Sequence, residues 1–204
     1  MATTSVTGSK ATNKLQTKDF ISIGVFSVLF AVVLFLFGAV GGLLAALFPL
    51  FGVFGFLVCG IVVMYLLAKV PKRGVMLLLG AITAVIYFLI GAYGPIPLFV
   101  LAGGIVGELI AGSGHYRSFP RIVIGYAAYS ILIWFGFMSP LVFSMQSYID
   151  ASVASYGAEY TRMLLDFAHG PLLIAAGIGT VAGAIDGAFL GRKLFKKHFE
   201  KIGV

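Results

Sequence analysis

The stretch SMQSYIDASVASYGAEYTRMLLDFAHGP, residues 144–171, decides the fold. It interrupts an otherwise hydrophobic chain, and its own apolar residues recur at intervals of three and four, which is the spacing of one face of an α-helix. They are Ile149, Val153, Tyr156, Tyr160, Met163, Leu164 and Phe167. Polar residues such as Glu159 and Arg162 take the other face, and Gly170-Pro171 is a usual helix end followed by a new start. The stretch therefore predicts an amphipathic helix at a membrane surface, with membrane-spanning helices before and after it.

The composition indicates a membrane protein. Of 204 residues, 60% are hydrophobic and 10% are charged, and the mean hydropathy is +1.08. A soluble domain of this size has roughly a quarter charged residues. The chain has one cysteine, Cys59, so a disulfide framework or a thiolate metal site is excluded. We expect an all-α polytopic membrane protein.

Six apolar runs are each about as long as a membrane-spanning helix requires. Residues 1–18 are predicted to be a disordered cytoplasmic tail, not a signal peptide, and residues 19–204 one six-helix membrane domain. The amphipathic helix is placed between spans five and six, on the extracellular side. The predicted spans are Phe20–Val40, Leu44–Ala68, Val75–Ala92, Leu98–Ala111, Ile122–Phe143 and Leu172–Leu190.

The basic residues predict the orientation in the membrane. With six spans, all Lys and Arg residues except Arg162 fall on the side of the two termini. Cytoplasmic loops carry an excess of Lys and Arg, so both termini are predicted to be cytoplasmic in a multi-pass protein of the cell membrane. The net charge of +7 thus reflects orientation in a lipid bilayer, and no nucleic-acid partner is expected.

Small residues spaced four apart predict close helix packing. Span six contains Gly183, Gly187 and Gly191 at this spacing, and span four contains Gly103 and Gly107. We expect both stripes to pack inside the bundle. Span one carries Ser27-x-x-x-Ala31 beside Gly24, a stripe that could pack inside or face a partner protein.

Two acids, Glu108 and Asp186, lie within predicted spans near their cytoplasmic ends. Acids inside a membrane are costly and often functional. We expect pairing with a basic neighbour such as Arg117 or Arg192, with a partner contact or a proton relay as the alternatives. The run Gly112-Ser113-Gly114-His115 could suggest a serine protease, but the pair would lie in a cytoplasmic loop without a second-helix histidine.

Aromatic and polar residues gather in the predicted outer half of the bundle. Aromatic walls with a few polar groups form small-molecule pockets, and an interfacial aromatic belt is the alternative reading. The predicted substrate-binding residues are Tyr93, Trp134, Met138, Gln146, Tyr148, Arg162, Asp166 and His169.

Four segments together resemble the MptD (Trep_Strep) family of substrate-binding S components of energy-coupling factor (ECF) transporters. They are KDFISIGVFSVLFAVV (18–33), LLAKVPKRGVMLLLGAI (66–82), GELIAGSGHYRSFPR (107–121) and GAFLGRKLFKKHFEKIGV (187–204). The resemblance extends from Lys18 to Val204, and its motifs contain no catalytic signature.

The resemblance implies a six-helix protein that captures a vitamin or similar micronutrient from outside. Such a protein delivers its substrate by toppling in the membrane while bound to a transmembrane coupling subunit and two ATP-binding cassette ATPases. It is not an enzyme and needs no cofactor, and the chain indeed has no phosphate-binding loop. The family's first span commonly docks through Ala-x-x-x-Ala. The nearest match here is Ser27-x-x-x-Ala31 with Gly24, which departs from that motif.

Three alternatives remain open at this level. The chain could be a membrane-embedded scaffold or regulatory subunit without a small-molecule ligand, or an intramembrane enzyme. As a substrate, a planar or hydrophobic micronutrient is favoured over a sugar, and Arg162 alone outside disfavours a polyanion. Haem is the alternative substrate, because His169, Tyr148 and Met138 are residue types that ligate haem iron.

Overall fold

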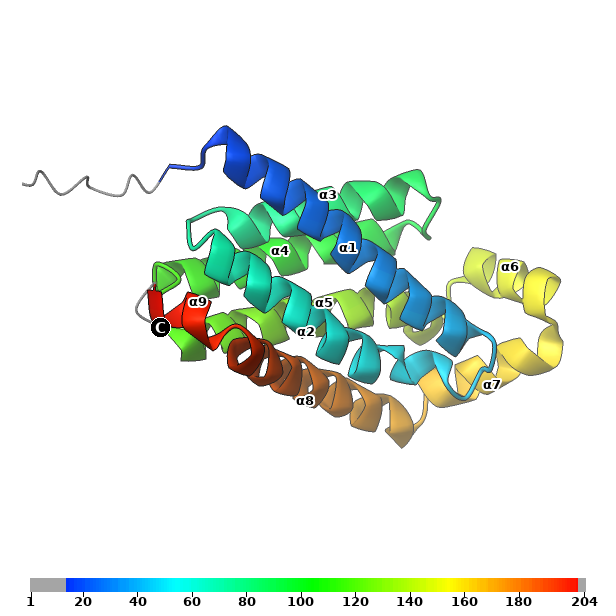
Figure 1. The fold of residues 1–204 in the computed structure, drawn as a ribbon. Coiled ribbons are helices and arrows are strands. Elements are labelled where there is room, and N and C mark those ends of the chain that lie inside the picture. The colour runs from blue at the N-terminus through cyan, green and yellow to red at the C-terminus, as the bar shows by residue number, and fades with distance from the viewer. Residues whose placement is uncertain (1–13, 202–204) are drawn as a thin grey trace, which may run out of the picture.

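A computed structural model describes residues 14–201, and the first thirteen residues of the predicted tail lie outside this range. Its elements are helical throughout the described range (Figure 1). They are α1 (Thr17–Gly42), the 3-10 turn η1 (Phe48–Leu50), α2 (Phe51–Lys69), α3 (Val75–Leu89), α4 (Pro95–Ser113), α5 (Phe119–Val142), α6 (Gln146–Tyr156), α7 (Ala158–Ala168), α8 (Pro171–Leu194) and α9 (Lys196–Lys201).

The six predicted spans correspond to α1, α2, α3, α4, α5 and α8. Five of these stretches are long and apolar enough to cross a membrane, and α3 is a shorter apolar helix. With 15 residues, α3 rises about 22 Å, less than the roughly 30 Å of a hydrocarbon core. The all-helical polytopic fold is therefore confirmed.

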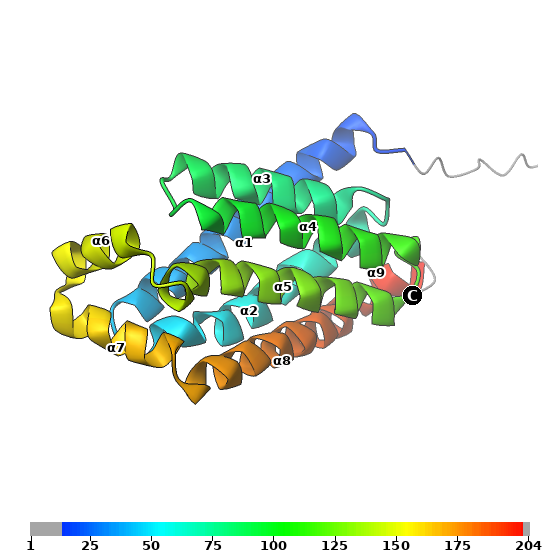
Figure 2. The same ribbon diagram turned by 180° about the vertical axis from the view of Figure 1, so that it is seen from behind.

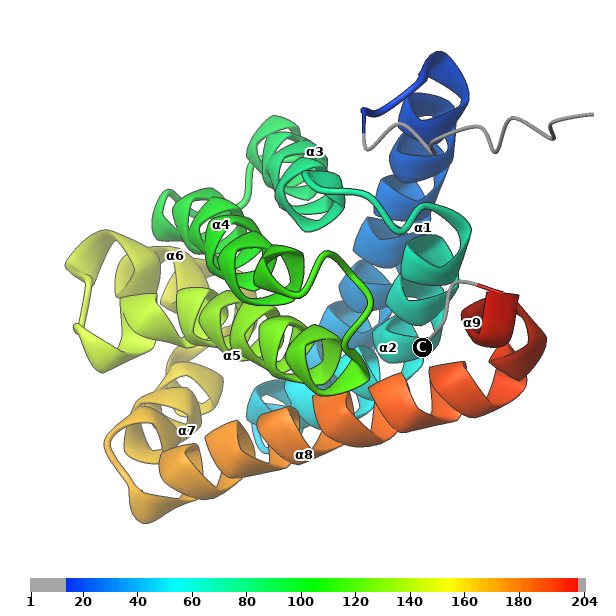
Figure 3. The same cartoon turned by 90° about the vertical axis from the view of Figure 1, so that its left-hand side faces the viewer.

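These six helices form a closed ring in the order α1, α3, α4, α5, α8 and α2, each packing against the next (Figure 3). Large buried side chains such as Phe30, Phe56 and Tyr129 fill its centre. Phe30 of α1 stacks on Tyr129 of α5 with ring centroids 5.4 Å apart. Tyr126 of α5 donates a hydrogen bond of 2.6 Å to the Phe56 carbonyl of α2.

Glycines allow α2 and α8 to approach backbone to backbone. A Cβ on Gly183 would lie 2.1 Å from the Val53 carbonyl oxygen, and one on Gly187 would lie 2.4 Å from that of Leu57. Such contacts leave no room for a side chain. The prediction that the stripe of span six packs inside the bundle is confirmed. The same holds for span four, where a Cβ on Gly107 would lie 3.1 Å from the Gly125 carbonyl oxygen of α5.

The predicted amphipathic helix is two helices. α6 and α7 form a hairpin that projects beyond the end of the ring opposite both described chain ends (Figure 2). The chain turns at Gly157, whose φ of 91° and ψ of 162° are accessible to glycine but strained for other residues. The prediction of one continuous helix was wrong, because helical spacing on both sides of Gly157 concealed this turn.

Candidate functional site

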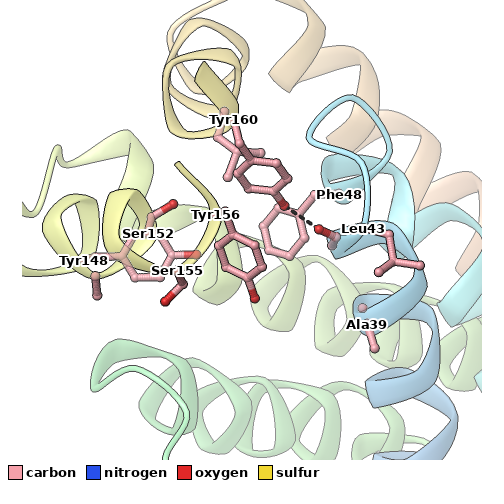
Figure 4. A pocket seen from close by; sticks show the side chains of 12 residues that line it. Ala39, Leu43, Phe48, Tyr148, Ser152, Ser155, Tyr156 and Tyr160 are labelled. Carbon is pink, nitrogen blue, oxygen red and sulfur yellow. Dashed lines mark hydrogen bonds between the residues drawn. The ribbon is translucent and has the colours of Figure 1, made fainter. Parts of the chain in front are cut away.

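Two adjoining cavities lie under the hairpin, between it and the end of α1. Their volumes are about 390 and about 360 Å³. They share the lining residues Gly38, Ala39, Phe48, Tyr148 and Tyr156, so we treat them as one site and call it the hairpin cavity. In Figure 4, Tyr156 and Tyr160 of the hairpin face Ala39 and Leu43 at the end of α1.

The walls of the hairpin cavity are aromatic and uncharged. α1 contributes small residues and Leu34 and Phe35, while α3 and the α3–α4 turn contribute Tyr87 and Tyr93. Phe137 of α5 completes the wall. No charged side chain is found among the described residues that line either cavity. Ser152 and Ser155 and the tyrosine hydroxyls supply the polar groups.

Tyrosines hold the hairpin over the cavity. The Tyr160 hydroxyl donates a 2.7 Å hydrogen bond to the Gly42 carbonyl at the end of α1 (Figure 4). Tyr93 hydrogen-bonds Ser147 at the start of α6, and its ring meets that of Tyr148 edge to face at 5.1 Å.

Within the hairpin, the hydroxyls of Ser152 and Thr161 lie 2.8 Å apart and join α6 to α7. Aromatic and hydroxyl contacts, not ion pairs, therefore hold the hairpin over the cavity.

The hydroxyls of Tyr148 and Tyr160 in the hairpin stay protonated at neutral pH. Burial, and then the neighbouring Tyr160 and Tyr156, raise the pKa of Tyr148 to about 12. Burial followed by Tyr156 also raises the pKa of Tyr160. Desolvation disfavours the charged phenolate. Each hydroxyl therefore remains a hydrogen-bond donor as well as an acceptor.

One lining tyrosine has a buried hydroxyl without a hydrogen-bond partner. Tyr87 of α3 is only 3% exposed, and its hydroxyl has no hydrogen-bond partner. Its ring meets Phe137 edge to face at 5.5 Å. Buried polar groups in native proteins are nearly always hydrogen-bonded, so each exception needs an explanation.

The structure brings together only part of the predicted pocket. Tyr93 and Tyr148 line the hairpin cavity. Trp134 and Met138 are buried inside the bundle instead, 3% and 0% exposed. The Trp134 indole N–H donates a 2.8 Å hydrogen bond to the Pro49 carbonyl, so this side chain anchors η1 to α5.

The other predicted pocket residues lie on the hairpin surface, outside the lining of the cavity. Gln146 hydrogen-bonds Asp150 at 2.7 Å, and Arg162 forms an exposed ion pair with Asp166 at 3.9 Å. His169 is exposed and near Ser144, with 3.5 Å between its Nε2 and the serine hydroxyl.

Of the three residues considered for haem, only Tyr148 lines the cavity. Among the described residues, no group of three or more His, Cys, Asp and Glu side chains is placed to hold a metal ion.

The cavity is also lined by aromatic residues for which no sequence pattern predicts a pocket role: Phe48, Tyr87, Phe137, Tyr156 and Tyr160. Tyr156 and Tyr160 belong to the apolar face of the amphipathic stretch, a pattern that predicts an inward orientation but does not identify a ligand site. Gly38 and Ala39 leave space for the cavity because they are small, but no sequence pattern marks them as pocket residues.

The stripe of Gly24, Ser27 and Ala31 on α1, which was predicted to dock a partner, faces the bundle interior in part. Ser27 is fully buried, 4% of Ala31 is exposed, and the Ser27 hydroxyl bonds the Ile23 carbonyl one turn back at 2.8 Å. Only Gly24 lies at the surface, with open space beside it. Of the two readings of this stripe, the structure therefore places Ser27 and Ala31 in the bundle interior.

At the opposite end of the bundle, Glu108 has a structural role. Its carboxylate accepts hydrogen bonds from the N–H groups of Gly74 at 2.8 Å and Met76 at 3.1 Å, and one from the Tyr116 hydroxyl. Burial, and then the Glu108 charge, raise the pKa of Tyr116. The expected pairing of Glu108 with a basic neighbour was wrong, because the start of α3 supplies the donors instead.

Asp186 differs from Glu108. It lies on an exposed face of α8 that also carries Ile178 and Phe189, and no hydrogen bond or ion pair links it to another described residue. The Ser113 hydroxyl bonds the Ile110 carbonyl at 2.7 Å, while His115 lies 3.1 Å from Arg73. Ser113 and His115 therefore do not form a catalytic pair.

A family model described as "hypothetical bacterial integral membrane protein (Trep_Strep)" matches residues 17–201. Nothing among the curated proteins or the solved structures matches the chain.

Proposed function

The chain belongs to the Trep_Strep family of hypothetical bacterial integral membrane proteins, and on that premise we propose that it is the S component of an ECF-type importer. In this role it captures a vitamin or similar micronutrient from outside the cell for ATP-driven uptake. The observation that carries the proposal is the hairpin cavity. It lies at one end of a membrane-spanning bundle, and the volumes of its two parts, about 390 and about 360 Å³, are each within the range of small-molecule sites.

The charge distribution supports an outward-facing cavity. Within residues 14–201, all Lys and Arg residues except Arg162 lie at the end of the bundle where α1 begins and α8 ends. The positive-inside rule assigns that end to the cytoplasm. The hairpin cavity is at the other end, so a ligand would enter from outside.

The chemistry of the walls favours an uncharged aromatic or hydrophobic micronutrient. A charged ligand would lose its hydration without gaining a counter-charge from the lining, which is unfavourable. Aromatic rings give large contact areas with flat ligands. A sugar or polyanion fits this lining poorly.

The exposed surface of α1 supports the proposed contact with a transmembrane coupling subunit. Only 28% of its most apolar window is buried within the chain, the lowest share of the five long spans. Since Ser27 and Ala31 face inward, the coupling subunit would meet Gly24 and the apolar side chains around it. Those exposed side chains are Ile21, Val25, Val28, Leu29, Val32, Phe35 and Leu36.

Reconstitution tests the proposal. The chain is co-expressed with an ECF coupling subunit and its two ATPases, and uptake of a panel of labelled micronutrients is measured. We expect ATP-dependent uptake of one compound, abolished by an ATPase variant that cannot hydrolyse ATP. Mass spectrometry of the purified chain should identify the same compound as a bound molecule.

Absence of both uptake and a bound molecule would overturn the proposal. A scaffold or regulatory subunit without a ligand would then explain stable assembly without transport.

A further inference from the structure

We propose that the substrate is an uncharged lipophile that enters the hairpin cavity sideways from the outer leaflet of the membrane, through an apolar opening between α1 and the end of α3. The proposal rests on the proposed function for the use of the cavity as the substrate site, and it adds the route and the class of ligand.

α1 and α3 are joined at one end of the bundle and separate toward the other. At the first end, Lys72 in the turn before α3 forms an ion pair with Asp19 of α1. Toward the hairpin the two helices diverge, so that the end of α3 lies apart from the end of α1 (Figure 1 and Figure 2). Side chains do not fill the space between them completely, because the second part of the hairpin cavity is lined by residues of both helices.

The part of the cavity beside α3 has an apolar edge on the surface of the bundle. Phe35 of α1 and Ile90, the residue after α3, both line this part and are 55% and 56% exposed. Gly91 is a further lining residue and is also exposed. A residue that lines a cavity and is half exposed lies at its edge. We call the gap bounded by Phe35, Ile90 and Gly91 the side opening.

The surface around the side opening is that of a membrane-facing region. Leu36, Phe88 and Leu89 are more than half exposed there. Neither residues 20–68 nor residues 74–107 contain a charged side chain. An exposed apolar surface of this kind is in contact with lipid in a membrane-spanning protein. Because the positive-inside rule assigns the hairpin end to the outside, the side opening faces the outer leaflet.

The part of the cavity under the hairpin has a more polar edge. Ser155 lines this part and is exposed, and Ser152 adds a second hydroxyl. In the part beside α3, by contrast, the polar side-chain groups of the described lining residues are tyrosine hydroxyls. The hairpin is also held over the first part by the bond from Tyr160 to the Gly42 carbonyl. A ligand that uses the side opening reaches the cavity without breaking this bond.

An uncharged lipophile is the class of ligand that this route favours. Such a compound is already dissolved in the hydrocarbon layer, so it passes the apolar edge without losing hydrogen bonds to water. A charged or strongly polar compound would lose its hydration before it reached the cavity, which is unfavourable. Inside, the rings of Phe137 and Tyr148 provide a large contact area for an apolar molecule.

Two thiol reagents with the same reactive group test the route. Benzyl methanethiosulfonate is uncharged and partitions into membranes, whereas its trimethylammonium-ethyl analogue is charged and stays in water. Their reaction rates are measured on the full chain in lipid nanodiscs, with the buried Cys59 of the unchanged chain as the background. Gly38→Cys is the cavity variant, because Gly38 lines both parts and a Cβ there would meet nothing within 4 Å. Glu159→Cys, on the exposed surface of the hairpin, is the reference.

The measured quantity is the ratio of the benzyl rate to the charged rate. We expect it to be at least about tenfold higher in Gly38→Cys than in Glu159→Cys, because an apolar route excludes the charged reagent. Each ratio compares two reagents at one thiol, so a change in the reactivity of that thiol does not affect it.

Bulky substitutions at the two edges of the cavity assign the route. Added to Gly38→Cys, Ile90→Trp fills the side opening and should lower the ratio to nearly that of Glu159→Cys. Leu89→Trp is the matched control on the neighbouring membrane-facing surface, outside the lining, and should leave the ratio unchanged. Ser155→Trp at the hairpin edge should also leave it unchanged. Thermal unfolding of each variant shows whether it is folded.

Three results would overturn the proposal: equal ratios in Gly38→Cys and Glu159→Cys, a ratio that Ile90→Trp does not change, or one that Ser155→Trp lowers instead. The molecule recovered from the purified chain is an independent check, since it should partition into octanol and not into water. A water-soluble bound molecule would contradict the lipophile and leave the importer intact. Failure of the proposed function has a different signature, because uptake would then be absent while the labelling pattern remains.

Discussion

At the end of the bundle where the chain begins and ends, loops are joined by charged groups, whereas at the other end a hairpin is held by tyrosines. At the first end, Glu108 binds the start of α3, and Lys72 forms a 2.6 Å ion pair with Asp19, whose side chain is 8% exposed. At the second end, the Tyr160 hydroxyl and the Tyr93–Tyr148 contact hold α6 and α7 in place.

Under the proposed function, this difference suits a stable end and an opposite end that exchanges ligand. Hydrogen bonds to charged groups are roughly twice as strong as neutral ones, and losing one partner leaves a buried group unsatisfied. Neutral phenol contacts can break and reform at lower cost. We therefore expect the charged end to stay closed and the hairpin at the other end to open more readily.

The largest effect is expected at the charged end. Glu108→Ala leaves the N–H groups of Gly74 and Met76 and the Tyr116 hydroxyl without their acceptor. We expect a loss of about 3–5 kcal/mol and a fall in Tm of roughly 10 °C in detergent. Glu108→Gln keeps one acceptor and should lose about half as much. An unchanged Tm in Glu108→Ala would show that this end is not fixed by the carboxylate.

A smaller and local effect is expected from Tyr160→Phe. The change removes the bond to the Gly42 carbonyl, worth about 1 kcal/mol, and leaves the spanning helices intact. Hydrogen exchange should accelerate about fivefold in amides of residues 146–168, and remain unchanged in α2 and α8. Equal acceleration in α2 would mean that the hairpin and bundle open together.

The tyrosine end should also respond to alkaline pH. Because the pKa of Tyr148 is raised to about 12, the neutral hydroxyl stabilises the hairpin fully below about pH 10, the ordinary range of a phenol. This stabilisation is lost as the pH rises toward the raised pKa. Amide hydrogen exchange in the hairpin, corrected for intrinsic rates, should therefore accelerate between about pH 10 and about pH 12. In Tyr148→Phe the increase should shrink, and an identical profile would assign it to other groups.

The smallest effect is expected from Asp186→Asn, which separates the two intramembrane acids. Asp186 is exposed and without a partner among the described residues, so the isolated chain should change in stability by at most about 0.5 kcal/mol. Thermal unfolding beside Glu108→Gln measures the contrast. A large loss in Asp186→Asn would show that this acid, too, supports the fold.

The sequence predicted the spans well, because their length and hydropathy follow from the membrane itself. It also located the glycine contacts of α8, since only small residues tolerate such an approach. The turn at Gly157 was missed because helical spacing continues on both sides of it. The site was predicted in part, since which aromatic residues share a cavity depends on how α1, α3 and the hairpin meet. The donors to Glu108 are backbone groups, which a sequence pattern does not reveal.

The glycine contacts divide the bundle into stiff and compliant parts. α2 and α8 touch through Gly60 and Gly187, and α3 and α4 through Gly80 and Gly104, where backbones are in direct contact. α1 has no such contact with another long helix: a Cβ at Gly24 or Gly38 would meet nothing within 4 Å, and one at Gly41 would approach only the chain that follows α1, with the Leu47 carbonyl oxygen 3.3 Å away. Only side chains hold α1, and side chains can change rotamer as a helix tilts. α1 thus lacks the close backbone contacts that would resist tilting against the other long helices, and because it forms a wall of the hairpin cavity, a tilt of α1 would change the volume of the site.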